Sequence, residues 1–416
     1  MSLAHDTKVA SDGRAHDLTA GAPDLTIASC KRGTPSGELL RRYWHPIARA
    51  DEVSDLPVLV KVLDEELVLF RTPLGFGLVY PRCIHRGASL LHAKVEQEGL
   101  RCCYHGWLFG LDGTLLEAPC EPAGRVPLGL RQPWYPVVER FGLVWTYMGP
   151  SDRQPLFPAI PWMENLGSED VLLVGGGVNL DPSGDIFPEH QDYNWWHLFD
   201  NLMDPFHLYI LHSRISGEQL GAAWTGYPDV SFQRLPNGVV NIARRPLSGG
   251  DHHYFVSQSL LPNISCSTPL EGRAGAIMIW IVPRDDTSYR TFSLMVGRKP
   301  TCSPDNDAGA KPGSRPPPWV GPNKPALEWT TEDHQRWPID YTVMKWMGDI
   351  SLHSEEHLTT TDRGISIMRQ VFRQQARIVA DGGDPEGASR DRARVLEPAQ
   401  FSREEVDDIL AARYPS

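Results

Sequence analysis

The sequence predicts an α+β protein with two unequal parts, a small all-β domain over residues 25–150 and a larger α+β domain over residues 151–416. Three observations support this division. The first part holds short β-branched and apolar runs that are separated by turn residues. The second part mixes strand-like runs with longer stretches of helical periodicity, which favours an antiparallel sheet combined with helices. Prolines mark a linker between the two parts, at Pro155, Pro158 and Pro161.

Length and composition are those of an ordinary globular protein. The chain has 416 residues, of which 41% are apolar and 22% charged, enough for two domains with a sizeable core. A net charge of -12 argues against a nucleic-acid partner, because few cations are left to neutralise phosphates. No apolar run reaches the roughly 18 residues of a membrane span, and the charged start has no apolar core of a signal peptide. Seven scattered cysteines form no disulfide framework, which predicts a reducing cytoplasm.

The N-terminal part opens with residues 1–24, a polar and patternless stretch that we expect to be a flexible tail. From Ser36, the sequence GELLRRYWHPIA predicts a short helix that ends at Pro46. Residues 58–72 and 134–148 each predict a strand, a turn and a second strand.

The C-terminal part is predicted to contain both strands and helices. Apolar runs predict strands at 178–181, 238–244, 254–261, 275–283 and 289–297. Helical periodicity predicts helices near 192–212, 340–357 and 360–380. Residues 303–325 are rich in Pro and Gly and predict a surface loop or partly disordered insertion. Ser402 and Glu405 have the spacing of a capping box, which predicts a last short helix.

Four potential metal ligands lie in two short loops of the β-rich part. Cys83-Ile-His85 is followed, after sixteen residues, by Cys102-Cys-Tyr-His105, and each pair is followed by a glycine within two residues. Two thiolates and two imidazoles can hold a tetrahedral zinc ion, or a [2Fe–2S] cluster with both histidines on one iron. Zinc sites usually keep like ligands together. Since each loop here supplies one thiolate and one imidazole, the spacing favours the cluster.

The pattern Cys-x-His-x16-Cys-x-x-His-Gly-Trp resembles the Rieske motif of the Rieske non-haem iron oxygenases. The sequence GTPSGELLRRYWHP is similar to the opening of phthalate- and phenoxybenzoate-type members of that family. The resemblance extends from about residue 30 to about residue 380. It implies a Rieske [2Fe–2S] domain, then a helix-grip-like catalytic domain with a mononuclear Fe(II).

A second group of ligands follows in Asp204-Pro205-Phe-His207-x4-His212. Mononuclear non-haem iron needs two imidazoles and one carboxylate on one face. Residues five apart on an ideal α-helix point about 140° apart, so shared binding requires a π-type bulge or a helix end. His-x4-His is common by itself, and Asp204-Pro205 is also a natural helix start. The resemblance implies that His207 and His212 bind iron, and that Asp204 bridges from His207 to His105 of another subunit.

The third iron ligand must be a later carboxylate. Several acidic residues lie in helical patterns, namely Asp333, Asp340, Asp349, Glu355, Glu356 and Asp362. The resemblance favours Asp340, because in phthalate-type members the ligand precedes a Met-Gly pair by seven and eight residues, as Asp340 precedes Met347-Gly348. Asp349 and Asp333 are the next alternatives. Asn201 lies where the family often has a polar residue near the iron, and a purely structural amide is the other interpretation.

The resemblance implies that the substrate is an aromatic carboxylate or an aryl ether. It also implies that the enzyme uses O2 to dihydroxylate the ring of this substrate. A carboxylate needs a cation, for which Arg244 and Arg214 are candidates. Arg244 and Arg245 are neighbours on a predicted strand and point to opposite faces, so at most one faces the pocket. Phe206 and Trp280 are candidates for the apolar lining, with ordinary core packing as the alternative.

Electrons must come from a separate protein, because the chain has no GxGxxG nucleotide-binding fingerprint. The resemblance implies an NAD(P)H-dependent reductase with flavin and an iron–sulfur centre, and a head-to-tail homotrimer or stacked hexamer. One alternative is a Rieske monooxygenase or an O- or N-demethylase. A more distant alternative is an electron carrier that uses only the cluster.

Overall fold

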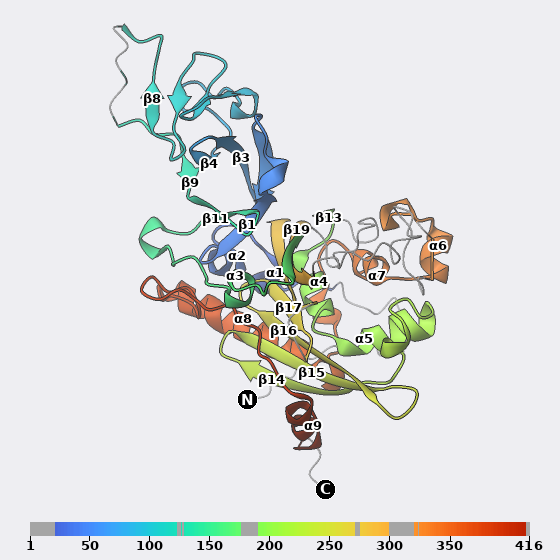
Figure 1. The fold of residues 1–416 in the computed structure, drawn as a ribbon. Coiled ribbons are helices and arrows are strands. Elements are labelled where there is room, and N and C mark those ends of the chain that lie inside the picture. Colours follow the sequence, from blue (N-terminus) through green and yellow to red (C-terminus); the bar gives the residue numbers. More distant parts are fainter. Residues whose placement is uncertain are drawn as a thin grey trace.

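The computed structural model describes residues 21–122, 126, 129–175, 190–270, 275–298, 320–322 and 324–412. The predicted strand 178–181, most of the 1–24 tail and most of the 303–325 loop lie outside these residues. Figure 1 shows an elongated molecule in which the N-terminal β-rich part forms one end and a large sheet with its helices forms the other. No helix within the described residues is long and apolar enough to span a membrane.

The N-terminal part consists of small antiparallel sheets, as predicted for an all-β domain. Its strands are β1 (Trp44–Arg49), β2 (Val58–Val62), β3 (Glu65–Thr72), β4 (Gly75–Val79), β5 (Lys94–Val95), β6 (Leu100–Arg101), β7 (Leu108–Phe109), β8 (Leu115–Glu117), β9 (Trp134–Tyr135), β10 (Val137–Arg140) and β11 (Leu143–Tyr147). They pair in the orders β1-β11-β10, β2-β3-β4-β9 and β5-β6-β7-β8. The predicted strand pairs over 58–72 and 134–148 are confirmed.

The helix predicted from Ser36 to Pro46 is wrong in its second half. After α1 (Leu25–Ala28), the helix α2 (Pro35–Leu40) ends at Leu40, and Pro46 lies inside strand β1. β1 is an edge strand and its register shifts just after Pro46. A proline that lacks the N–H donor is tolerated at an edge or bulge of this kind.

An antiparallel sheet forms the centre of the larger part. Its strands are β12 (Asp170–Gly175), β13 (His190–Gln191), β14 (Asp229–Leu235), β15 (Gly238–Pro246), β16 (His252–Leu260), β17 (Ile264–Thr268), β18 (Ile277–Asp285) and β19 (Ser288–Arg298). The order is β12-β19-β18-β17-β16-β15-β14, and β13 also pairs with β19. The four predicted strands between 238 and 297 are confirmed as β15, β16, β18 and β19, whereas β12, β14 and β17 were not predicted.

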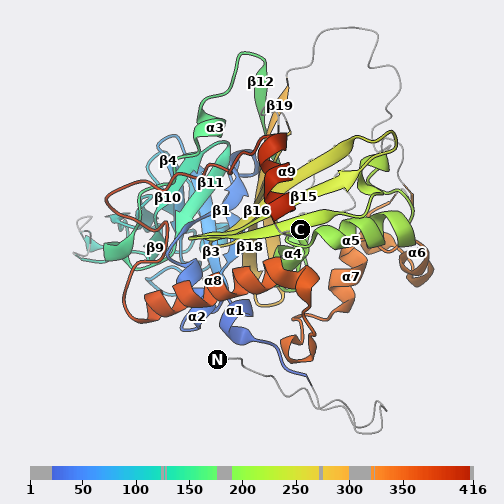
Figure 2. The same ribbon diagram turned by 90° about the horizontal axis from the view of Figure 1, so that it is seen from below.

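Helices cover the sheet on both faces. They are α3 (Pro161–Glu164), α4 (Trp195–Asn201), α5 (Pro205–Tyr209), the π-helical turn η6 (Ile210–Ile215), α6 (Thr331–Arg336), α7 (Asp340–Trp346), α8 (Arg363–Ala380) and α9 (Arg403–Ala412). Figure 2 shows α8 and α9 against the β14–β16 part of the sheet. Val406 and Leu410 of α9 pack on Ile242 of β15. Gly364 of α8 lies against Phe232 of β14, whose side chain is on the other face of the sheet, so α8 and α9 cover opposite faces.

The predicted helices are present, with different limits. The prediction over 360–380 is confirmed by α8, and the capping box at Ser402 is present at α9. The helix predicted over 340–357 is shorter, because α7 ends at Trp346. The helix predicted over 192–212 is divided into α4, α5 and η6.

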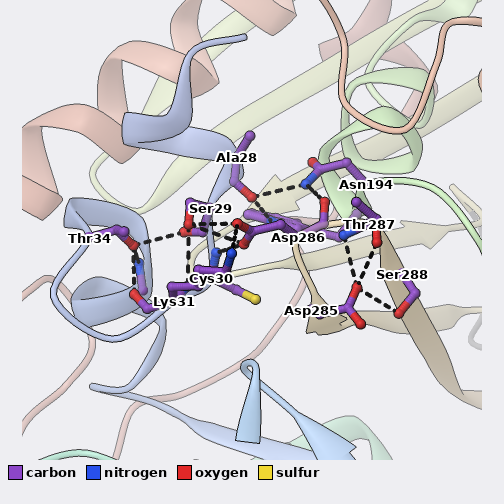
Figure 3. Close-up of polar contacts among 12 residues, drawn as sticks. Ala28, Ser29, Cys30, Lys31, Thr34, Asn194, Asp285, Asp286, Thr287 and Ser288 are labelled. Carbon is purple, nitrogen blue, oxygen red and sulfur yellow. Dashed lines mark hydrogen bonds and ion pairs between the residues drawn. The ribbon is translucent and has the colours of Figure 1, made fainter.

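A polar junction connects the N-terminal segment to the start of α4 (Figure 3). In the turn between β18 and β19, the Asp286 carboxylate accepts hydrogen bonds from the Cys30 N–H at 2.8 Å and the Ser29 hydroxyl at 3.1 Å. The Asn194 amide donates to the carbonyls of Ala28 and Asp286, at 3.0 and 2.6 Å. Asn194 also caps α4, so this junction fixes where the helix begins.

The described residues form two large hydrophobic cores. The main core runs from the N-terminal part into the large sheet and includes Leu39, Trp145, Trp195, Trp280 and Met368. A separate core surrounds the two Cys-His loops and includes Val68, Phe70, Leu90, Trp107 and Phe109. The loops therefore lie in a packed environment of their own.

Candidate metal centres

Two loops with the same backbone pattern carry Cys83, His85, Cys102 and His105. In the first loop the Gly87 N–H donates to the carbonyl of Cys83 at 2.7 Å, and in the second the Gly106 N–H donates to that of Cys102 at 3.0 Å. Both glycines have a φ of +74°, in the left-handed region that favours glycine. The glycine after each Cys-His pair is thus needed to close its loop.

The side chains of the two loops meet. The His85 and His105 rings are 4.5 Å apart, and His85 stacks on Trp107 at 4.5 Å. Cys83 and Cys102 are almost fully buried, and burial together with the neighbouring thiol raises the pKa of Cys83 to about 11. The buried Nδ1 of His85 has no hydrogen-bond partner within the described residues. Because a bound metal stabilises thiolates and uses free imidazole nitrogens, these residues fit a [2Fe–2S] cluster.

Two side chains outside the motif hold the loops. The fully buried Gln132 amide donates to the carbonyls of Tyr80 and Arg82, at 2.8 and 2.9 Å. Its oxygen accepts from the Ile84 N–H at 3.0 Å. Arg101 donates to a carbonyl of the second loop at 2.7 Å. Neither Gln132 nor Arg101 could be predicted from the sequence, because only folding brings them next to the loops and no sequence motif marks them.

The second group of predicted ligands converges from three elements. His207 lies on α5, His212 on η6 and Asp340 at the start of α7. The Nε2 atoms of His212 and His207 are 3.1 and 3.5 Å from Oδ1 of Asp340. One ligand atom from each residue lies within 4.8 Å of the other two. Two imidazoles and one carboxylate form the donor set of mononuclear non-haem iron, so these residues fit that metal.

The helix distortion expected between the two histidines is present. η6 is π-helical, and the Ser216 N–H donates to the carbonyl of Leu211, five residues earlier, at 3.0 Å. Each π turn holds more residues than an α turn, so residues five apart can share a face. Asp204 starts α5 by accepting a hydrogen bond from the Phe206 N–H at 2.7 Å.

Two amide side chains form hydrogen bonds with the candidate iron ligands. The Asn201 amide donates to Oδ1 of Asp340 at 3.1 Å. The Gln219 side-chain oxygen lies 2.9 Å from Nδ1 of His212. Because a carbonyl oxygen only accepts, a ring proton belongs on Nδ1, and Nε2 is the nitrogen that faces Asp340 and would bind a metal. Asn201 was singled out from the sequence. Gln219 was missed, since a lone glutamine in a loop gives no signal.

Electrostatics favour the ionised state of Asp340. Burial opposes its ionisation, but His212, His207 and the Asn201 amide outweigh burial and hold its pKa well below the usual value. The Asp204 carboxylate is 3.6 Å from Nδ1 of His207, and that nitrogen has no hydrogen-bond partner within the described part of the chain. Of the other acidic candidates, Asp333 caps α6 and pairs with Lys324 at 2.9 Å.

The two predicted arginines have partners other than the candidate metal ligands. Arg244 forms ion pairs with Asp407 of α9 at 2.7 Å and with Asp229 at 3.2 Å. It therefore belongs to the α9 face of the sheet, and the prediction that it binds substrate needs correction. Arg214 is exposed and its guanidinium lies 4.9 Å from the Tyr209 ring.

The two predicted aromatic residues lie in different places. Trp280 is 2% exposed and packs edge-to-face on Trp145 at 5.0 Å, so it belongs to the main core and not to a pocket beside the iron ligands. Phe206 lies on α5, next to His207, with its ring 5.8 Å from that of Tyr227. Phe206 therefore lies on the helix that carries the candidate ligand His207, whereas Trp280 does not.

Comparisons with known proteins agree with this geometry. The family model "Rieske [2Fe-2S] domain" matches residues 43–137, which include both loops. Phenoxybenzoate dioxygenase subunit alpha of Ectopseudomonas oleovorans is 39% identical over 388 residues, 92% of each chain. The 5,5'-dehydrodivanillate O-demethylase oxygenase subunit of a Sphingobium species is 31% identical, over 88% of this chain and 82% of that one.

A solved structure shares the fold. NdmA of Pseudomonas putida CBB5, with caffeine, has a TM-score of 0.59 at 17% identity, covering 88% of this chain and 99% of that one. The Rieske match favours a [2Fe–2S] cluster over zinc in the two loops. Since the similarity to oxygenase subunits also extends over nearly the whole length, the chain belongs to the Rieske non-haem iron oxygenases, as the oxygenase (α) subunit.

Proposed function

We propose that this oxygenase uses O2 and electrons from a separate NAD(P)H-dependent reductase to dihydroxylate an aromatic carboxylate or aryl ether. The observation that carries the proposal is the convergence of His207, His212 and Asp340 in a chain that also has the two Cys-His loops. The likeness to the phenoxybenzoate dioxygenase subunit supports this substrate class.

Each residue has a role in this proposal. Cys83, His85, Cys102 and His105 would hold the [2Fe–2S] cluster, and the three convergent residues would hold Fe(II). The iron would supply open positions for O2 beside the substrate, and the cluster would supply electrons. Asn201 and Gln219 orient Asp340 and His212. Asp204 lies close enough to His207 to connect that ligand with an approaching cluster.

The arrangement of one chain supports a head-to-tail homotrimer. The cluster loops and α5 are far apart in Figure 1, so electrons would pass to the iron from the cluster of a neighbouring copy, with Asp204 near that copy's His105. Towards the end of α7, the helix that begins at Asp340, the apolar side chains of Val343, Trp346 and the following Met347 are 43%, 72% and 47% exposed. Exposed apolar groups of this kind favour a protein contact. A stacked hexamer and a cytoplasmic location belong to the same proposal.

The O-demethylase relative favours a second candidate, monooxygenation with loss of a methyl group. The products separate the two reactions. Dioxygenation puts both atoms of ¹⁸O2 into one product molecule, whereas demethylation releases formaldehyde.

Anaerobic purification, iron and sulfide analysis and EPR of the dithionite-reduced protein test the metal assignments. We expect a Rieske signal and about three irons per chain, two in the cluster and one at the second site. His207→Ala should lose one iron and keep the signal. The control His357→Ala changes an exposed histidine and should keep all the iron. Zinc in place of iron would refute both centres, and a cluster without the third iron would favour an electron carrier.

A further inference from the structure

A buried arginine lies directly beneath the iron-binding helix. Arg245 is on β15, next to Arg244 but on the opposite face, and has 0% exposure. Its Nη2 donates to the carbonyl of Pro205 at 2.9 Å. Pro205 is the first residue of α5, two positions before His207. The guanidinium is therefore close to the predicted iron ligands.

Arg245 has no anionic partner within the described residues. Its Nε and Nη1 atoms are buried and lack hydrogen-bond partners there, and burial lowers its pKa to about 10. Three other buried arginines in the described ranges each contact a carboxylate: Arg41 with Glu65, Arg42 with Asp384, and Arg369 with Asp200 and Glu356. The partly buried Arg394 resembles Arg245 in having two nitrogens without partners there, but it donates to the Leu261 carbonyl and not to the helix that carries His207. A buried cation is costly unless an anion compensates it. Arg245 is thus placed to receive one.

The surroundings of Arg245 are aromatic. Its guanidinium lies 4.8 Å from the Trp224 ring, and the same ring lies 4.8 Å from His253 and 5.1 Å from Phe255. His253 is directly opposite Arg245 on β16, and its buried Nδ1 also lacks a partner in the described part. A cation, an unpaired imidazole nitrogen and two aromatic rings suit a ligand with an acid group on an aromatic ring.

We propose that Arg245 binds the carboxylate of an aromatic acid and so holds its ring beside the iron ligands, an inference that rests on the proposed function. Carboxylates accept hydrogen bonds from the N–H groups at the edge of a guanidinium, whereas the Trp224 ring accepts none of the hydrogen bonds recorded for Arg245, so both contacts can exist together. Because Arg245 has no exposed surface, binding of the ligand requires the residues that cover it to rearrange, and Trp224 is one of them.

Binding of matched acids and amides tests this role. Calorimetry on the iron- and cluster-loaded protein, without O2, would compare benzoate with benzamide and 3-phenoxybenzoate with 3-phenoxybenzamide. We expect the wild-type protein to prefer at least one acid. Arg245→Met, which removes the charge and keeps a linear side chain, should weaken binding of that acid about 10- to 100-fold and change amide binding by less than about 3-fold.

Two further variants make the result specific. Arg245→Lys keeps the charge without the planar fork and should fall between Arg245→Met and the wild type; it also decides the question if Arg245→Met does not fold. Arg244→Met removes the neighbouring cation on the α9 face and should keep the acid preference. A wild-type protein that prefers neither acid, an unchanged preference in both Arg245 variants, or an equal loss in Arg244→Met would overturn the proposal.

Iron analysis of the same samples separates this inference from the proposed function. Three irons with an acid preference that does not depend on Arg245 would overturn the inference alone. If the chain lacks the third iron but Arg245→Met still weakens acid binding, the oxygenase function is contradicted. Arg245 would then still be a group that binds acids. Unchanged acid preference with a lowered melting temperature would mean that Arg245 is structural.

Discussion

Replacing Gln219 by methionine should weaken Fe(II) binding and spare the cluster. The Gln219 oxygen and Nδ1 of His212 are 2.9 Å apart, and the two residues are 6% and 3% exposed, so water cannot take over the contact. Methionine has a similar length and no carbonyl acceptor. Loss of the hydrogen bond that orients a ligating histidine typically lowers metal affinity about 10- to 100-fold. That range corresponds to about 1.4–2.7 kcal/mol.

The assay is an anaerobic Fe(II) titration against a chromogenic chelator, on protein that has lost the mononuclear iron and kept the cluster. The Rieske EPR signal of the same sample shows that the fold and cluster are intact. Gln219→Glu keeps an acceptor and should bind iron at least as tightly as the wild type. Gln374→Met removes an exposed glutamine, bonded to Arg234, and serves as the matched control. Wild-type affinity in Gln219→Met would refute the reasoning that Gln219 sets the His212 tautomer.

Three further substitutions test other contacts. Gln132→Leu removes three part-buried hydrogen bonds that hold the first cluster loop, at about 0.5–1.5 kcal/mol each, so the Rieske EPR signal should disappear at a lower temperature on heating. An unchanged temperature would contradict this role. Arg369→Met leaves the partly buried Asp200 carboxylate without its cation, which costs up to about 3–5 kcal/mol, so the denaturant midpoint should fall. A midpoint equal to the wild type would show that the pair contributes nothing. Trp346→Glu puts a charge on the exposed apolar surface at the end of α7, so sedimentation of the proposed trimer should shift towards monomer. Unchanged sedimentation would exclude this surface as the contact.

The candidate metal ligands that are close to one another in the sequence could be predicted, because the chain itself keeps them together. Each Cys-His pair lies within one loop, and His207 and His212 are five residues apart. Helix geometry then required a distortion between the histidines, and η6 provides it. Asp340 was different: no local pattern distinguishes it from the other acidic residues, and it was chosen through resemblance to a family.

Contacts between distant segments could not be predicted in this way. Strand alternation showed that Arg244 and Arg245 face opposite sides, but which side is covered by α9 and which by α5 depends on the packing of the whole sheet. Gln219 reaches His212 only because the chain folds back after the π turn. Pro46 suggested a helix end, and only the pairing of β1 as an edge strand explains its place.

The separate hydrophobic core around the Cys-His loops has a consequence for how the subunit matures. Because the residues of this core, such as Phe70 and Leu90, belong to a cluster distinct from the main core, this region can open as a local unit while the large sheet stays folded. In hydrogen exchange, the amides of β6 and β7 should therefore exchange before those of β18. The cluster could then be inserted, lost and replaced on an already folded subunit, independently of iron loading at the second site.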